Sequence, residues 1–292
     1  METSELLRKV RQIEIKTRGL TRNIFAGEYH SAFKGKGMTF ADVREYQPGD
    51  DIRAIDWKLT ARYQHPFIKL FAEERELTIM LLVDVSASQA FGTQVQLKQQ
   101  LLTEVAAVLA FSAIQNNDKI GVIFFTDKVE KFIPPKKGKM HVLRIIRELL
   151  DFKPSSKGTS ISIALNYMIN IIKRHSAAFI ISDFVDNDWE KALKIASLKH
   201  DLVALQVYDV AEQSFPNAGL VEVSDLETGR SFLLDSSSKW VRTHLGKSWH
   251  QHKERLRETF SRNNIDYVEL RTDQSYVKPL MNLFKKHERL RR

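Results

Sequence analysis

Hydrophobic and polar positions follow two different periods over residues 77–290. Short, nearly continuous apolar runs, typical of strands buried on both faces of a sheet, occur at 77–85, 119–127, 177–184 and 201–209. The segments between them place apolar residues at helical spacing, as Leu97, Leu101, Val105 and Val108 do within 94–115. Strands that alternate with helices predict a doubly wound, mostly parallel α/β sheet with helices on both faces.

The same patterns predict the remaining elements of this part of the chain. Helices are expected over 138–152, 159–175, 189–200, 239–263 and 275–290, a strand over 265–270, and a hairpin insertion near 218–235. Residues 1–75 have a different character, with a short amphipathic helix over 1–20 followed by a stretch rich in glycine and charge. Turn signals at 34–37 and 47–51 break that stretch, and 66–74 reads as a strand. We therefore expect an N-terminal segment over 1–75 and an α/β domain over 76–292.

Composition sets limits on the class of protein. The chain has 292 residues, of which 43% are hydrophobic, so it can bury a sizeable core. It contains no cysteine, which excludes disulfides and thiolate metal sites. No apolar stretch approaches the ~20 residues of a membrane span, and the N-terminus lacks the apolar core of a signal peptide. We expect a cytoplasmic location.

The net charge of +9 is concentrated near the C-terminus, because residues 239–292 hold 14 Lys or Arg against 6 Asp or Glu. Such a region can meet nucleic acid, an anionic membrane surface or an acidic protein. No aromatic residues interleave the charges in a stacking pattern, so nucleic acid is not favoured and a solvated helix face is the simpler interpretation.

Oxygen-bearing side chains gather where the predicted strands end. Asp84, Ser86 and Ser88 follow the first apolar run, Thr159 precedes a helix, and Asp183 ends another strand. The carboxyl ends of parallel strands share one edge of a sheet, so these side chains should converge there. Oxygen ligands suit a hard cation such as Mg²⁺, or Mn²⁺ in its place. The simpler alternative is that each residue only caps a helix.

The motif Asp-x-Ser-x-Ser at 84–88, with Thr159 and Asp183 downstream, resembles the metal-ion-dependent adhesion site of von Willebrand factor A domains. The resemblance implies that Ser86 and Ser88 bind the metal directly, Thr159 directly or through water, and the two aspartates mainly through water. It also implies that a partner's carboxylate completes the coordination. Many family members have glycine after the last aspartate, whereas this chain has Phe184, which we expect to narrow access to the metal.

The segment 35–62 (GKGMTFADVREYQPGDDIRAIDWKLTAR) resembles the hallmark of a bacterial family known only as domain of unknown function fifty-eight, and the likeness extends over roughly residues 25–210. Members carry an A-like domain and are typically encoded beside MoxR-type AAA+ ATPases. The resemblance implies a protein accessory to such an ATPase and brings no established biochemical activity. Together with the predicted metal site, it leads us to expect a non-enzymatic, metal-dependent protein-binding module that supports the ATPase in complex assembly or remodelling. Its expected partner is the ATPase, or a membrane-anchored A-domain protein, bound through an acidic residue; peripheral membrane contact is an alternative.

Two enzymatic alternatives start from the acidic residues. A phosphatase of the haloacid dehalogenase type would use Asp84 as nucleophile but needs a second Asp where Ser86 stands, and a hydroxyl cannot take over that proton transfer. A metal-dependent nuclease could use Asp50, Asp51, Asp56 and Lys58. Against the nuclease, these residues lie in a segment punctuated by Gly and Pro, where Asp51, Arg53, Asp56 and Arg62 can instead form ion pairs that pin the N-terminal segment to the main domain.

Overall fold

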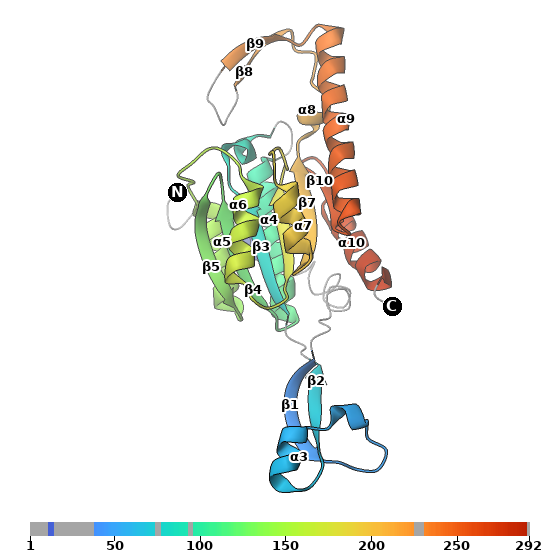
Figure 1. Cartoon of the computed structure of the whole chain (residues 1–292). Coiled ribbons are helices and arrows are strands. Elements are labelled where there is room, and N and C mark those ends of the chain that lie inside the picture. The colour runs from blue at the N-terminus through green and yellow to red at the C-terminus, as the bar shows by residue number, and fades with distance from the viewer. Residues whose placement is uncertain (1–10, 15–37, 74–76, 93–95, 225–230, 291–292) are drawn as a thin grey trace. The chain divides into compact units, whose positions relative to one another are not determined.

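The computed structural model describes residues 11–14, 38–73, 77–92, 96–224 and 231–290 (Figure 1). The chain divides into two compact units, one of Lys34–Leu77 and one that joins Met1–Phe33 to Thr78–Arg292. Residues 11–14 form a helical turn, and Glu14 there pairs with Lys139 of the large unit at 2.8 Å. The rest of the helix expected over 1–20 lies outside the described residues.

The large unit is built on a six-stranded sheet in the order β10-β7-β6-β3-β4-β5. Its strands are β3 (Thr78–Asp84), β4 (Lys119–Phe125), β5 (Val129–Lys136), β6 (Ala177–Ser182), β7 (Asp201–Tyr208) and β10 (Asp266–Arg271). Every neighbouring pair is parallel except β4 and β5. The predicted mostly parallel α/β fold is confirmed.

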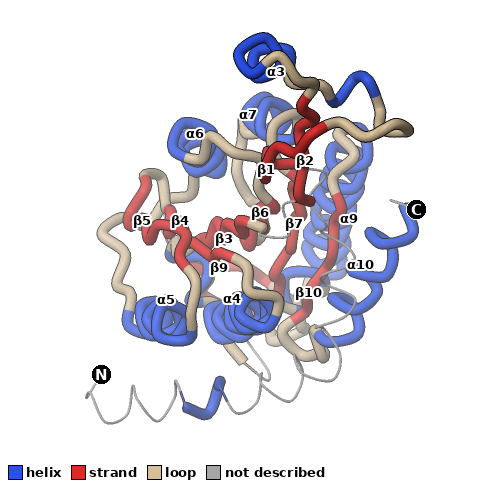
Figure 2. Tube along the Cα trace, turned by 90° about the horizontal axis from the view of Figure 1, so that it is seen from below, coloured by secondary structure: helices blue, strands red, loops and turns tan. Residues whose placement is uncertain are grey.

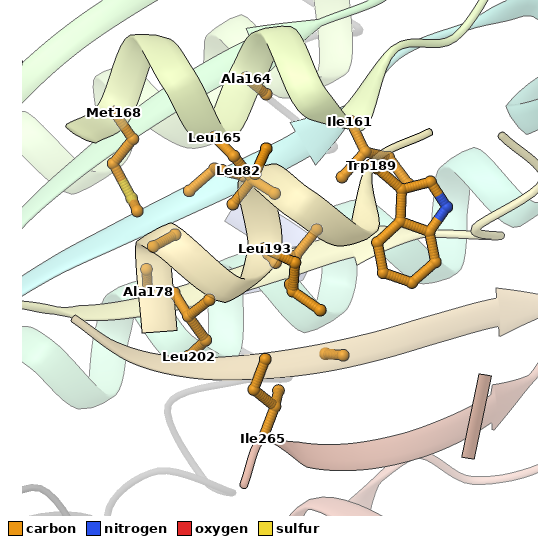
Figure 3. Close-up of a cluster of buried hydrophobic side chains, with 14 of the residues drawn as sticks. Leu82, Ile161, Ala164, Leu165, Met168, Ala178, Trp189, Leu193, Leu202 and Ile265 are labelled. Atoms are coloured by element: carbon orange, nitrogen blue, oxygen red, sulfur yellow. The ribbon is translucent and has the colours of Figure 1, made fainter. Parts of the chain in front are cut away.

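Helices cover both faces of this sheet (Figure 2). They are α4 (Lys98–Gln115), α5 (Lys139–Asp151), α6 (Ile161–Ile171), α7 (Glu190–Ser197), α9 (Lys239–Arg262) and α10 (Val277–Leu290). Apolar residues of α6, α7 and α9 form one buried cluster with the core strands, so these helices share a face. Figure 3 shows Leu82 of β3, Leu165 of α6 and Leu193 of α7 among the side chains of this cluster. The helices α4 and α5 lie on the opposite face.

Two smaller elements complete this part of the large unit and were not predicted. They are the 3₁₀ turn η3 (Ala87–Ala90) and the short helix α8 (Val210–Gln213). The strand β5 was also missed, because it contains Pro134 and Pro135, which have no N–H to donate to a sheet. It lies at the edge of the sheet, where prolines are tolerated.

The hairpin predicted near 218–235 is present as β8 (Leu220–Ser224) and β9 (Ser231–Asp235). Its two ends are held together because Ser236 N donates to the Gly219 carbonyl at 2.8 Å. In the described parts of the chain no helix is long and apolar enough to cross a membrane.

The small unit pairs β1 (Met38–Glu45) with β2 (Phe67–Glu73) in antiparallel register and adds η2 (Ile52–Ala54) and α3 (Trp57–Tyr63). The predicted turn at 47–51 is present, with Gly49 at φ +109° and Asp50 N bonded to the Gln47 carbonyl at 3.0 Å. The turn expected at 34–37 lies outside the described residues. No residue of η2 or α3 is buried, so this unit leaves most of its helical surface exposed.

Candidate metal-binding site

The order of the strands in the sheet reverses beside β3. After β3 the chain adds β4 and β5 on one side, whereas β6, β7 and β10 are added on the other. The strand order therefore reverses between β3 and β6, and the helices that follow these two strands, α4 and α7, cover opposite faces. Ligands of such sheets bind at the carboxyl ends of the strands, at this reversal point. Asp84 ends β3 and Asp183 directly follows β6, so both lie at that point.

Asp84 is completely buried, and its carboxylate organises the loop that follows β3. Its Oδ1 accepts a hydrogen bond from the backbone N–H of Ser86 at 2.9 Å. Its Oδ2 accepts from the Ser182 hydroxyl at 2.6 Å and from Gln89 Nε2 at 3.3 Å. The aspartate thus holds the Ser86 turn in place and is itself held by neighbours on two elements.

The hydroxyls of the two serines of the motif come together in this loop, where Ser86 is buried and Ser88 is half-buried. Ser86 Oγ and Ser88 Oγ lie 3.0 Å apart, and Gln89 Nε2 is 3.3 Å from Ser88 Oγ. Ser88 is one of the groups that hold the pKa of Asp183 down against the opposing effect of burial. Hydrogen bonds thus link Asp84, Ser86 and Ser88 through Gln89, and Asp183 follows the neighbouring strand β6 at the same edge of the sheet.

The loop that carries Thr159 is fastened to both of the other loops. The Lys157 carbonyl accepts from Ala87 N at 3.1 Å, and Ser160 N donates to the Thr126 carbonyl at 2.8 Å, just beyond the end of β4. Ile161 N donates to Asp186 Oδ2 at 2.7 Å, which ties the start of α6 to the loop after β6. Thr159 consequently belongs to the same edge of the sheet, half-buried between these anchors.

Phe184 does not narrow access to the site, which corrects the expectation from sequence. Its side chain is completely buried and packs against Trp189 and Phe260, with ring centroids 5.7 and 5.2 Å away. Its φ of +58° lies in the left-handed region that glycine adopts without strain, and this explains why glycine suits the position. The neighbouring side chain Val185 is the exposed one, at 57%.

Sequence reasoning missed the most unusual side chain of the cluster, Lys98. It is the first residue of α4 and is 1% exposed. Its ammonium group lies 2.9 Å from Asp183 Oδ2 and 2.8 Å from Glu212 Oε1 of α8. Lysine is almost never buried unless it is paired, and a cation at the start of a helix opposes the helix dipole. The helix expected over 94–115 placed Lys98 beyond its first turn, so the position of this lysine at the start of α4 was not predicted.

The charged groups of the cluster shift one another's pKa values. Burial, and then the negative charge of Asp183, raise the pKa of Asp84 to about 7. Burial also opposes the ionised form of Asp183. The positive charge of Lys98 and the hydrogen bonds that the Asp183 carboxylate accepts nevertheless hold the pKa of Asp183 below its usual value. Burial likewise opposes the charge on Lys98, yet Asp183 and Glu212 outweigh it and raise the pKa of Lys98. The ion pair is therefore charged at neutral pH, whereas Asp84 is partly protonated near that pH.

The donor set fits a hard divalent cation. Two ligand oxygens at right angles about Mg²⁺, each at 2.0–2.1 Å, are about 2.9 Å apart, which matches the 3.0 Å between Ser86 Oγ and Ser88 Oγ. Gln89 Oε1 is buried and has no hydrogen-bond partner in the described structure, so an acceptor is free for a donor such as water. Gln89, Asp84 and Ser86 also line a cavity of about 120 Å³, which has room for several water molecules.

The acidic residues of the nuclease alternative have other roles within the small unit. Asp50 forms a bidentate ion pair with Arg44 at 2.9 and 2.7 Å. Asp51 caps η2, and Asp56 caps α3 by accepting from Lys58 N and Leu59 N. Among the described residues no three His, Cys, Asp or Glu side chains lie close enough to share a metal. The site proposed at the end of β3 differs from such a cluster, because its direct ligands would be serine hydroxyls and only two aspartates support them.

Comparison with known proteins agrees with the sequence resemblance. The uncharacterized protein Mb1516 of Mycobacterium bovis is 26% identical over 282 residues, which cover 95% of this chain and 88% of that protein. The uncharacterized protein YeaD of Bacillus subtilis is 31% identical over 109 residues, 37% of this chain and 25% of YeaD.

Two solved structures are similar at the level of the fold. BatB from Bacteroides thetaiotaomicron gives a TM-score of 0.46 with 17% identity, covering 73% of this chain and 99% of BatB. The SpRpn10 VWA domain gives a TM-score of 0.37 with 12% identity, covering 71% of this chain and 94% of that domain. Likenesses of this strength do not bear on function. The family model described as "Protein of unknown function DUF58" matches residues 42–255, and the chain therefore belongs to the DUF58 family.

Proposed function

We propose that this chain is a non-enzymatic, metal-dependent protein-binding module, accessory to a MoxR-type AAA+ ATPase that assembles or remodels complexes. Its docking site is the rim formed by Asp84, Ser86, Ser88, Thr159 and Asp183. The observation that carries the proposal is the 3.0 Å pair of serine oxygens, which stands at the reversal point of the sheet and is backed by two buried carboxylates.

Each rim residue has a separate task in this proposal. Ser86 and Ser88 present neutral oxygens to Mg²⁺ or Mn²⁺, and Thr159 adds a third hydroxyl from the neighbouring loop. Asp84 and Asp183 orient the serines and water rather than binding directly, because their oxygens already accept hydrogen bonds from Ser86 N, Ser182, Val185 N and Lys98. When bound, the metal would supply an electrophilic position for one carboxylate of a partner protein.

A binding role suits the chemistry of the rim better than turnover. The acid/base aspartate that a phosphatase would need is replaced by Ser86, whose backbone N–H donates to Asp84 and whose hydroxyl is bonded to Ser88. We therefore expect no phosphatase, ATPase or nuclease activity, and an activity lost in Asp84→Asn would favour the hydrolase alternative instead.

The proposal is tested by measuring the affinity of this chain for its MoxR-type ATPase in Mg²⁺ and in EDTA at fixed ionic strength. The metal–carboxylate contact lies at the centre of the interface, so removing the metal should weaken the complex by about tenfold or more, which is about 1.4 kcal/mol. Ser86→Ala should weaken it to the same extent without any chelator. A membrane-anchored A-domain protein of the same system is the second partner to be measured.

A matched control separates the rim from general effects of losing a buried serine. Ser112 is buried in α4 and donates to the Val108 carbonyl at 2.9 Å, away from the rim. Ser112→Ala should leave the metal-dependent affinity unchanged. An equally tight complex in EDTA would show that the partner docks elsewhere.

A further inference from the structure

Lys98 places a fixed positive charge beside the proposed metal site. Its ammonium group donates to Asp183 Oδ2, while Asp183 Oδ1 accepts from Val185 N at 3.2 Å. The lysine cannot swing into solvent without leaving two acceptors unpaired, because Glu212 Oε1 holds it from the other side. Glu212 is in turn held by the capping box that it forms with Asp209 at the start of α8.

We propose that Lys98 is a tethered cation that lowers the affinity of the rim for divalent metal, so that metal is retained only when a partner's carboxylate joins it. This inference rests on the proposed function and concerns the regulation of the same site. Lys98 acts in two ways. It repels a second cation at close range, and it occupies one oxygen of the aspartate that would otherwise serve the metal's water shell.

The charge balance of the cluster supports this role. Asp84, Asp183 and Glu212 offer three carboxyl groups, and Lys98 offsets one of them without any metal. Charges a few ångströms apart, at the effective dielectric of a protein surface, interact strongly enough to change metal affinity by about an order of magnitude. A partner's carboxylate adds the negative charge that Lys98 cancels, and so makes metal binding and partner binding mutually dependent.

The test compares two variants that remove charges of opposite sign, and it asks whether each raises or lowers the affinity for metal. Lys98→Met removes the positive charge and keeps the length of the side chain, so the dissociation constant for Mn²⁺, and for Mg²⁺, should fall by about tenfold or more. Glu212→Gln removes a negative charge from the same cluster, and the dissociation constant should rise about threefold or more. Both constants are measured by titration calorimetry with the chloride salts alone, at fixed ionic strength and about pH 8.

A purely structural role for the ion pair gives a different pattern. If Lys98 only positions Asp183, both single variants should weaken metal binding. The double variant Lys98→Met/Glu212→Gln keeps the net charge of the cluster and should bind metal as the wild type does. Asp183 loses its Lys98 partner in both variants that carry Lys98→Met, so circular dichroism and thermal unfolding are measured on each to show that it folds.

Lys253 provides a matched control on α9. It is 8% exposed and pairs with Glu269 at 2.5 Å, so it is another buried lysine in an ion pair within the same unit. Lys253→Met should leave the metal dissociation constant unchanged. The inference is overturned if Lys98→Met binds metal no more tightly than wild type. If the wild type binds metal but Lys98→Met binds it no more tightly, only the proposed role of Lys98 is rejected. If neither the wild type nor any variant binds metal, the metal site is rejected as well.

Discussion

Asp84 links the chemistry of the site to the stability of the folded chain. Burial and the neighbouring Asp183 raise the pKa of Asp84 to about 7, well above the ordinary value of 3.8 for an aspartate. Between these two pH values the folded chain holds a proton that the unfolded chain has lost. The contribution of this group to the free energy of unfolding is therefore largest below the unfolded-state pKa and falls as the pH rises toward 7.

Replacing Asp84 by asparagine should reverse this loss in the metal-free protein. An asparagine side chain cannot ionise, so Asp84→Asn should raise the melting temperature relative to wild type more at about pH 8 than at about pH 5. The measurement is thermal unfolding in EDTA across that range. Asp127→Asn, at an exposed position, serves as the control. A difference in melting temperature that does not change with pH would contradict the raised pKa of Asp84.

Single residues differ in how far the sequence reveals them. Asp84, Ser86, Ser88 and Asp183 were predictable because apolar runs end directly before or at them, and parallel strands end at one edge. Lys98 was not, because a polar residue in an amphipathic helix is normally exposed, and its partner Asp183 is 85 positions away. Nothing in the local pattern around Lys98 encodes such a distant pairing.

Packing between elements, rather than sequence periodicity, determines where the side chain of Phe184 lies in the loop after β6. Phe184 fills the space between this loop, α7 and α9 by packing on Trp189 and Phe260. The sequence shows only a bulky residue where glycine is common, and steric narrowing of the site was the natural interpretation. The strand β5 escaped prediction for a related reason, because its prolines are acceptable only at a sheet edge whose position depends on the whole topology.

Truncation of Phe184 distinguishes these two interpretations. Phe184→Ala should lower the free energy of unfolding by about 3 to 5 kcal/mol, because it leaves a cavity between β6, α7 and α9. The backbone at position 184 is equally strained with alanine, so the change reports packing alone. Denaturant unfolding measures it, and the exposed Val185→Ala should change stability by less than about 0.5 kcal/mol. A stable Phe184→Ala protein with stronger metal binding would instead restore the sequence-based view that this ring limits access to the rim.

The positive charge of the molecule is concentrated in the C-terminal region, residues 239–292. Many cations of the basic C-terminal region already have acidic partners in the described structure. The pairs are Arg255–Glu190, Arg257–Glu254, Arg257–Glu269, Arg262–Glu258, Lys253–Glu269, Arg271–Asp273 and Lys286–Asp266. These contacts neutralise individual cations locally, but residues 239–292 still hold 14 Lys or Arg against 6 Asp or Glu and remain basic.

Calorimetric titration of Mg²⁺ into the wild-type chain, in the presence of a short peptide with a single glutamate, measures directly whether the rim binds metal. The account predicts saturable binding of one metal ion per chain, lost in Ser86→Ala and kept in Ser112→Ala, together with a rise in melting temperature in excess metal because the metal binds only the folded state. The absence of metal binding by the wild type in the presence of the peptide, or equal binding by Ser86→Ala, would contradict the assignment of the rim as a metal site.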